Sequence, residues 1–167
     1  MEWILKERID NRFQDTSAYK FEKIIGNLFS KKGYHSFITS KTGDKGADII
    51  ADDGNESIAI QAKCYSFDNS VGVDSIKEVL WGMREYKCDR GIVVTSSSFT
   101  SSAIQSANKY DEIELWDYKK LRKELERYAD KSKTNTVDND YRNLFSPEFW
   151  DRVFVVIILF IFMRMII

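Results

Sequence analysis

Three polar side chains in the middle of the chain, Asp48, Gln61 and Lys63, have types and a spacing that suit joint chemistry, and we refer to them as the trio. A hard cation such as Mg²⁺ takes oxygen ligands and usually keeps several waters, so one or two carboxylates can hold it. Asp48 can supply the charged ligand, Gln61 a neutral oxygen and the backbone carbonyl of Ala62 another. Lys63 can orient or help to deprotonate an attacking water and stabilise developing charge. The set fits phosphodiester hydrolysis with Mg²⁺, or alternatively Mn²⁺, as cofactor.

A hairpin of two strands, residues 47–52 and 57–64, must bring the trio together. Side chains alternate between the faces of a strand, so the second and third members share a face. A two-residue turn at Gly54-Asn55 places the first member directly opposite the second. A turn at Asp53-Gly54 places it opposite Ala59 instead, but still on the same face. Glycine followed by asparagine suits the first turn, and a three-residue loop would move the acid to the other face.

The pattern on either side of the hairpin predicts alternating helices and strands. Apolar side chains recur at helical spacing between Thr16 or Ser17, which can cap a helix, and Gly33, which can end it. Strands are predicted at residues 34–39, 91–95 and 113–116, and helices at residues 70–87, 100–110 and from 117 onward. The order α-β-β-β-α-β-α-β-α predicts an α/β fold, a mixed central sheet with helices on both sides. Glu22, one residue off the apolar stripe of the first of these helices, could approach the trio as a water-mediated ligand.

Composition excludes several classes of protein and site. The formal net charge is −1, so contact with nucleic acid requires a local basic patch, such as the lysines of residues 17–45. Cys64 and Cys88 lack the spacing of a zinc site or a disulfide framework. The single histidine, His35, is expected to be a surface residue or satisfied histidine, because no nucleophile-elbow motif accompanies it.

The ends of the chain differ in composition from its centre. Residues 1–15 predict a short helical extension ahead of a domain of residues 16–129, and the polar stretch 130–148 predicts a linker. Charged residues follow Trp3 within a few positions, so the N-terminus lacks the apolar run of a secretory signal. We therefore expect the domain to be cytoplasmic.

A hydrophobic tail occupies residues 149–167, and from Val153 onward it carries a single charged side chain, Arg164. A helix rises about 1.5 Å per residue, so the tail approaches the roughly 30 Å of a hydrocarbon core only when Phe149 and Trp150 are included. We expect a single-pass membrane anchor, with the domain tethered to the cytoplasmic face. A buried terminal helix or an oligomer contact is the alternative.

Several short stretches, in the right order, resemble the catalytic domain of Mrr-like restriction endonucleases, which belong to the PD-(D/E)XK nuclease superfamily. The resemblance covers roughly residues 17–125. The matching stretches are Phe21-Glu22, Gly33-Tyr34, residues 42–50, residues 60–65, residues 94–100 with Ala103, and Leu115-Trp116-Asp117 with Leu121. Residues 42–50 look like the glycine-bracketed acid of the family, and residues 60–65 look like its Gln-x-Lys strand.

The resemblance implies a restriction-endonuclease-like sandwich and a metal-dependent DNA endonuclease that restricts foreign or modified DNA. It assigns the trio as the catalytic core, with Glu22 as an accessory acid. Such domains usually carry a separate DNA-reading module, and residues 1–15 are too short for one. A homodimer is expected if both strands are to be cut.

Further residues could contact the phosphates of DNA. Lys41 and Lys45 precede Asp48 in a polar loop, and their ammonium groups suit phosphate contacts. Ser96, Ser98 and Thr100 could donate hydrogen bonds to phosphates near the start of a predicted helix, although ordinary helix capping explains them as well.

The sequence also allows three other interpretations of the function. The domain could be a catalytically silent DNA-binding domain on the same fold, or a nuclease of another kind, such as a junction resolvase. It could also be a membrane-anchored scaffold whose polar residues are only solvated. Metal binding that depends on Asp48 separates a nuclease from the scaffold, and branched DNA separates a resolvase from a restriction-like enzyme.

Overall fold

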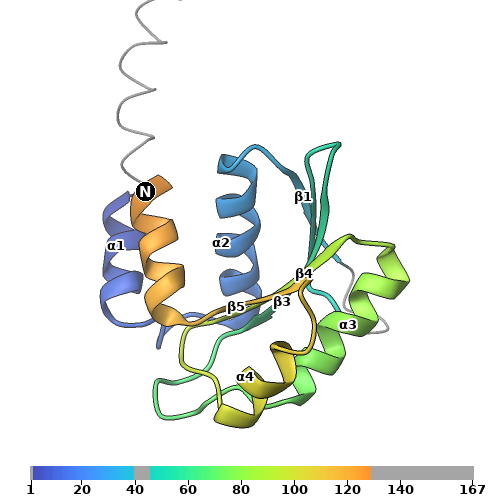
Figure 1. The fold of residues 1–167 in the computed structure, drawn as a ribbon. Coiled ribbons are helices and arrows are strands. Elements are labelled where there is room, and N and C mark those ends of the chain that lie inside the picture. The colour runs from blue at the N-terminus through green and yellow to red at the C-terminus, as the bar shows by residue number, and fades with distance from the viewer. Residues whose placement is uncertain (1, 40–45, 129–167) are drawn as a thin grey trace, which may run out of the picture. The chain divides into compact units, whose positions relative to one another are not determined.

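A five-stranded mixed sheet forms the centre of the computed structural model, which describes residues 2–39 and 46–128 (Figure 1). The strand order is β1-β2-β3-β4-β5, antiparallel among the first three strands and parallel from β3 to β5. The strands are β1 (His35–Ile38), β2 (Ile49–Asp52), β3 (Ser57–Lys63), β4 (Arg90–Thr95) and β5 (Ile113–Trp116). The prediction of an α/β fold with a mixed central sheet is confirmed.

Helices cover both faces of the sheet and enclose two hydrophobic clusters. The named helices are α1 (Glu2–Asp10), α2 (Ala18–Lys31), α3 (Asp74–Tyr86) and α4 (Ser101–Ala107), and residues 118–128 are also helical. Figure 1 shows α1, α2 and the helix of residues 118–128 on one side of the sheet, and α3 and α4 on the other. Ile60 packs into the cluster on the α2 side, whereas its neighbour Ala59 packs into the cluster on the α3 side.

The helix α2 forms where the apolar spacing predicts it. The side chain of Ser17 accepts a hydrogen bond from the backbone N–H of Lys20 and caps the helix. Phe21, Ile25 and Phe29 are buried on its inner face. Gly33 follows the end of the helix with a φ of +102°, the left-handed conformation for which glycine is suited.

The helix α3 begins at Asp74, four residues later than the start of the helix predicted for residues 70–87. Val71 instead forms a parallel bridge with Phe99, and the backbone N–H of Val71 donates to the carbonyl of Ser98. Residues 70–73 are therefore held against the loop after β4, and helical hydrogen bonding starts only beyond them. Lys87 ends the helix with a φ of +55°.

The helix α1 belongs to the same hydrophobic core as the rest of the domain. Ile9 and Phe13 are buried there, and the hydroxyl of Tyr118 donates to the carbonyl of Ile9 over 2.8 Å. Arg12 and Phe13 both have positive φ, and the Arg12 guanidinium lies over the ring of Tyr118. Residues predicted as an extension thus contribute side chains to the core, because the chain reverses at Arg12 and Phe13.

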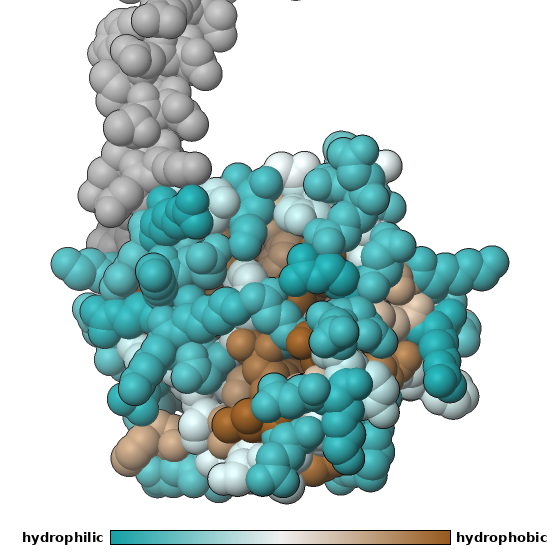
Figure 2. Space-filling view, viewed as in Figure 1, coloured by the Kyte–Doolittle hydropathy of each residue, from teal (hydrophilic) through white to brown (hydrophobic). Residues whose placement is uncertain are grey.

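The predicted linker of residues 130–148, the predicted hydrophobic tail of residues 149–167, and Lys41 and Lys45 lie outside the described residues. Within residues 2–39 and 46–128, no helix has the length and apolar character needed to cross a bilayer. Figure 2 shows a mainly hydrophilic surface on the viewed face, with hydrophobic side chains visible where α3 and α4 lie. Trp81 on α3 and Ile104 on α4 are among the exposed hydrophobic residues.

Candidate active site

The turn between β2 and β3 sets the register of the trio. Ile49 pairs with Ile60, which is the register expected for a turn at Gly54-Asn55. The side chain of Asp53 accepts hydrogen bonds from the backbone N–H groups of Asn55 and Glu56, both over 2.9 Å. These two bonds lower the pKa of the Asp53 carboxyl and stabilise the turn while it is ionised. The prediction of the Gly54-Asn55 register is confirmed.

Asp48 directly precedes β2, at the open end of the β2–β3 hairpin. Its backbone N–H donates to the carbonyl of Ile60 over 2.8 Å, and its own carbonyl accepts from the N–H of Thr39. Its side-chain Oδ2 accepts two hydrogen bonds of 2.7 Å, one from Nε2 of Gln61 and one from the backbone N–H of Ala62. The structure therefore brings the first two members of the trio into direct contact.

The face of the sheet that holds these side chains is the one covered by α3. Ile50 and Ala59 belong to the α3-side cluster, and side chains two residues along a strand share a face. Gln61 is 7% exposed, so its amide is removed from bulk water and aligned by its bond to Asp48. A polar group buried in this way needs a partner, which the carboxylate provides.

The oxygen donors of the site suit a hard cation that takes few ligands from the protein. Among residues 2–39 and 46–128, no group of three or more His, Cys, Asp or Glu side chains is arranged to hold a metal ion. Asp48 would give one anionic oxygen, Gln61 a neutral oxygen through Oε1, and water the remaining positions. Mg²⁺ accepts such a site because it retains several waters, whereas a zinc site needs more protein ligands.

Lys63 meets a partner that the sequence did not reveal. Its Nζ lies 2.7 Å from Oε2 of Glu78 on α3, and the two side chains are 19% and 43% exposed. That oxygen is a buried atom without a hydrogen bond of regular geometry, so the contact is an ion pair between close charges rather than an aligned hydrogen bond. No spacing rule in the sequence connects a strand residue with a helix residue of this kind.

Close backbone packing fixes α3 beside the start of β2. Gly46 has a φ of +77°, and a Cβ added to it would overlap the carbonyl oxygen of Glu78 and lie 2.9 Å from the backbone nitrogen of Gly82. A Cβ added to Gly82 would in turn lie 2.7 Å from the Cβ of Ala47. Two glycines therefore let the backbone that leads into β2 touch the backbone of α3, two residues before Asp48.

Glu22 lies on α2, the helix that packs against the opposite cluster from α3. It is 8% exposed and sits near the N-terminal end of α2. Two hydrogen bonds to the Asp48 carboxylate come from Gln61 and Ala62, and the ion pair of Lys63 goes to Glu78. Glu22 takes part in none of these contacts, so its role as an accessory acid stays a prediction.

The serines after β4 differ in their availability to a phosphate. Ser96 is fully buried, and its hydroxyl donates to the carbonyl of Tyr65 over 2.7 Å. The hydroxyl thus already has a partner inside the protein, and a phosphate contact of Ser96 stays a prediction. Ser98 is exposed and shares a hydrogen bond of 2.8 Å with the hydroxyl of Ser70.

Thr100 caps α4, since its Oγ1 accepts a hydrogen bond of 3.1 Å from the backbone N–H of Ala103. Replacing Thr100 by alanine should therefore lower the free energy of unfolding by about 1 kcal/mol, measured by urea titration. DNA affinity should stay within twofold of the wild-type value in a filter-binding assay. A large loss of affinity with unchanged stability would instead identify Thr100 as a phosphate contact.

The two cysteines and the histidine do not belong to the candidate active site. Cys64 and Cys88 are free thiols, and burial raises the pKa of both. A raised pKa keeps the thiol protonated near neutral pH and unreactive as a nucleophile. His35 is exposed on the edge strand β1.

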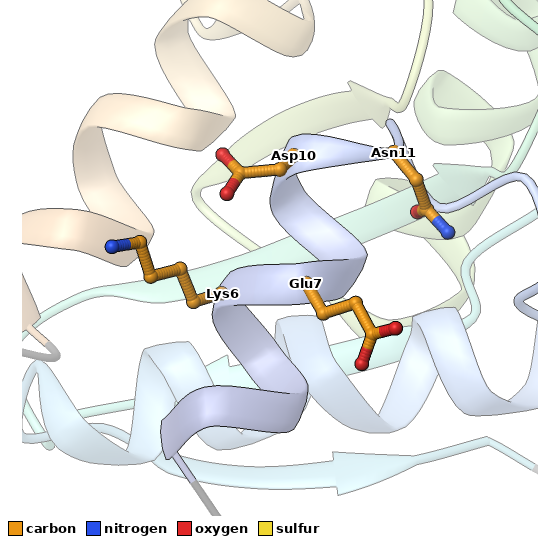
Figure 3. A pocket seen from close by; sticks show the side chains of 4 residues that line it. All are labelled: Lys6, Glu7, Asp10 and Asn11. Atoms are coloured by element: carbon orange, nitrogen blue, oxygen red, sulfur yellow. The ribbon is translucent and has the colours of Figure 1, made fainter.

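A surface hollow lies along α1, and its lining residues are Lys6, Glu7, Asp10 and Asn11 (Figure 3). The charges in it are mixed, and Asp10 is engaged with Arg122 at 3.5 Å. None of the four lining residues belongs to the trio.

Comparison with known proteins agrees with this geometry. The Mrr catalytic family model, described as a restriction endonuclease, matches residues 13–125. A type IV methyl-directed restriction enzyme of Escherichia coli K12, EcoKMrr, is 29% identical over 126 residues, which cover 71% of this chain and 40% of the relative. The chain thus spans well under half the length of that relative.

Two solved structures share the fold. The DNA modification-dependent restriction endonuclease AspBHI superposes with a TM-score of 0.56 at 19% identity, covering 80% of this chain and 40% of its own. The MspJI restriction endonuclease in complex with an oligonucleotide superposes with a TM-score of 0.52 at 22% identity, covering 68% and 29%. The family match spans most of the chain and includes every member of the trio. The chain therefore belongs to the Mrr catalytic family of restriction endonucleases.

Proposed function

We propose that this protein is a metal-dependent endodeoxyribonuclease that hydrolyses DNA phosphodiester bonds in the restriction of foreign or modified DNA. The observation that carries the proposal is the contact between Asp48 and Gln61, with Lys63 on the same face of β3. Membership of the restriction endonuclease family supports it. The names of EcoKMrr and AspBHI describe methyl-directed and modification-dependent enzymes, which supports modified DNA as the substrate.

Each member of the trio has a distinct part in the proposed reaction. A bound Mg²⁺ or Mn²⁺ would supply Lewis-acid stabilisation of the phosphate and a more acidic water. Asp48 and Gln61 would hold it, with the Ala62 carbonyl as a further oxygen. The ammonium of Lys63 would orient the attacking water and offset negative charge that develops on the phosphate. Lys41 and Lys45 remain our candidates for contacts to neighbouring phosphates.

The test is cleavage of supercoiled plasmid by the full-length chain, with Mg²⁺, with Mn²⁺ and with EDTA. Plasmid from methylating and non-methylating hosts should be compared in parallel. We expect nicked or linear product only with a divalent cation, and more of it from methylated DNA. Cleavage in EDTA, or intact plasmid of both kinds with a protein shown to be folded by circular dichroism, would contradict the proposal.

A further inference from the structure

Lys63 has the longest side chain of the trio, with the most rotatable bonds. Its backbone carbonyl accepts a hydrogen bond of 2.9 Å from Oγ1 of Thr95, so β4 fixes its main chain. The ammonium, however, stands at the end of four methylene groups and can occupy many rotamers. Chemistry at a phosphate needs that charge in one place, so an additional contact must select among the rotamers.

Glu78 makes that contact, and its backbone is closely packed against the segment before β2. Its Oε2 lies 2.7 Å from Nζ of Lys63. Its backbone lies directly against Gly46, where a Cβ would overlap the Glu78 carbonyl oxygen. The segment that leads into Asp48 therefore packs against the turn of α3 that carries Glu78. Asp48 and Gln61 contact each other directly, and Glu78 on α3 connects Lys63 to the same region.

We propose that Glu78 is a positioning residue for the Lys63 ammonium in DNA cleavage, an inference that rests on the proposed nuclease function. Glu78 acts through Lys63 and not as a ligand of the cation. The chain offers a matched control on the same helix: Asp74 pairs with Lys77 at 2.8 Å, but both side chains are largely exposed. Removing either acid changes the net charge of α3 by the same amount, and only Glu78 touches the trio.

Single-turnover cleavage of duplex DNA tests the proposal with the full-length chain and the Glu78→Gln, Glu78→Asp and Asp74→Asn variants. We expect Glu78→Gln to lower the maximal rate by about 10- to 100-fold, the scale of a misplaced reacting group. DNA affinity and the unfolding midpoint should change little. Glu78→Asp should recover part of the loss, and Asp74→Asn should cleave like the wild type. Full activity in Glu78→Gln would overturn the proposal.

A double-mutant cycle separates positioning from a merely structural role. In a Lys63→Ala background, Glu78→Gln should cause no further loss of rate, because its effect passes through the ammonium. A further loss of the same size as in the wild type would overturn the proposal. So would a loss of Mn²⁺ affinity in Glu78→Gln beyond about twofold, since it would make Glu78 a metal ligand.

A readout without catalysis distinguishes the failure of this inference from the failure of the proposed function. The ¹H–¹⁵N signal of the Lys63 ammonium, assigned by its loss in Lys63→Ala, should be protected from exchange in the wild type and lost in Glu78→Gln. Equal signals in both proteins would overturn the inference alone. No cleavage by the wild-type chain would overturn the proposed function, and this inference with it.

Discussion

Replacing Asp48 by asparagine is expected to abolish metal-dependent DNA cleavage while the domain stays folded. Asparagine keeps the shape of the side chain and can still accept the hydrogen bond from the Ala62 N–H, which the carboxylate accepts over 2.7 Å. It removes the anionic oxygen proposed to hold the cation. Metal stabilisation of a transition state is worth several kcal/mol, so the rate should fall by about 10³-fold or more. Single-turnover cleavage and calorimetric Mn²⁺ titration measure the two effects.

The matched control for this substitution is Asp111→Asn, which removes an exposed carboxylate outside the sheet. Its cleavage rate and Mn²⁺ affinity should equal those of the wild type. An Asp48→Asn protein that binds Mn²⁺ normally and cleaves within tenfold of the wild-type rate would exclude Asp48 as the metal ligand. It would instead favour a structural role, in which the Asp48 carboxylate only accepts the hydrogen bonds of the buried Gln61 amide and the Ala62 N–H.

Replacing Gly46 by alanine is expected to destabilise the domain strongly. The substitution forces a side chain into a φ of +77° and drives its Cβ into the carbonyl of Glu78. The left-handed conformation costs roughly 1–2 kcal/mol and overpacking typically another 1–3 kcal/mol. We expect a loss on the order of 3 kcal/mol or more in the free energy of unfolding, measured by urea denaturation.

Gly33→Ala is the control that separates the two contributions. Gly33 also has positive φ, at +102°, but a Cβ there meets no atom within 4 Å. It should therefore show only the backbone cost, about 1–2 kcal/mol. Equal losses for the two variants would mean that α3 shifts easily away from Gly46, and that the close contact beside Asp48 contributes nothing to stability.

The hairpin could be predicted from the sequence because local chemistry decides it. Gly54 takes a φ of +87°, and Asp53 caps the turn with its own side chain. The register that places Asp48 beside Gln61 follows from that turn and from the two-residue period of a strand. The chain needs no distant contact to specify this half of the site.

The other half depends on tertiary packing that no local pattern reports. Glu78 reaches Lys63 only because α3 docks on Gly46 through Gly82, a contact between segments more than thirty residues apart. The burial of Ser96, whose hydroxyl donates to the carbonyl of Tyr65, also depends on contacts between distant segments that the sequence does not report. The start of α3 at Asp74, later than the predicted residue 70, has the same cause, because Val71 pairs with Phe99 instead of joining the helix.

The contact between Ile9 and Tyr118 holds the first and last helices of the domain next to each other. The hydroxyl of Tyr118 binds the carbonyl of Ile9, and Arg122 reaches Asp10 one residue further along. The two ends of the domain therefore lie together on the α2 side of the sheet, where Figure 1 shows α1 beside the helix of residues 118–128. The trio lies on the opposite face, which α3 covers. Domains with adjacent ends tolerate insertion into longer chains. A DNA-reading module joined at either junction would attach on the α2 side and leave the α3 side, where the trio lies, free of the connection.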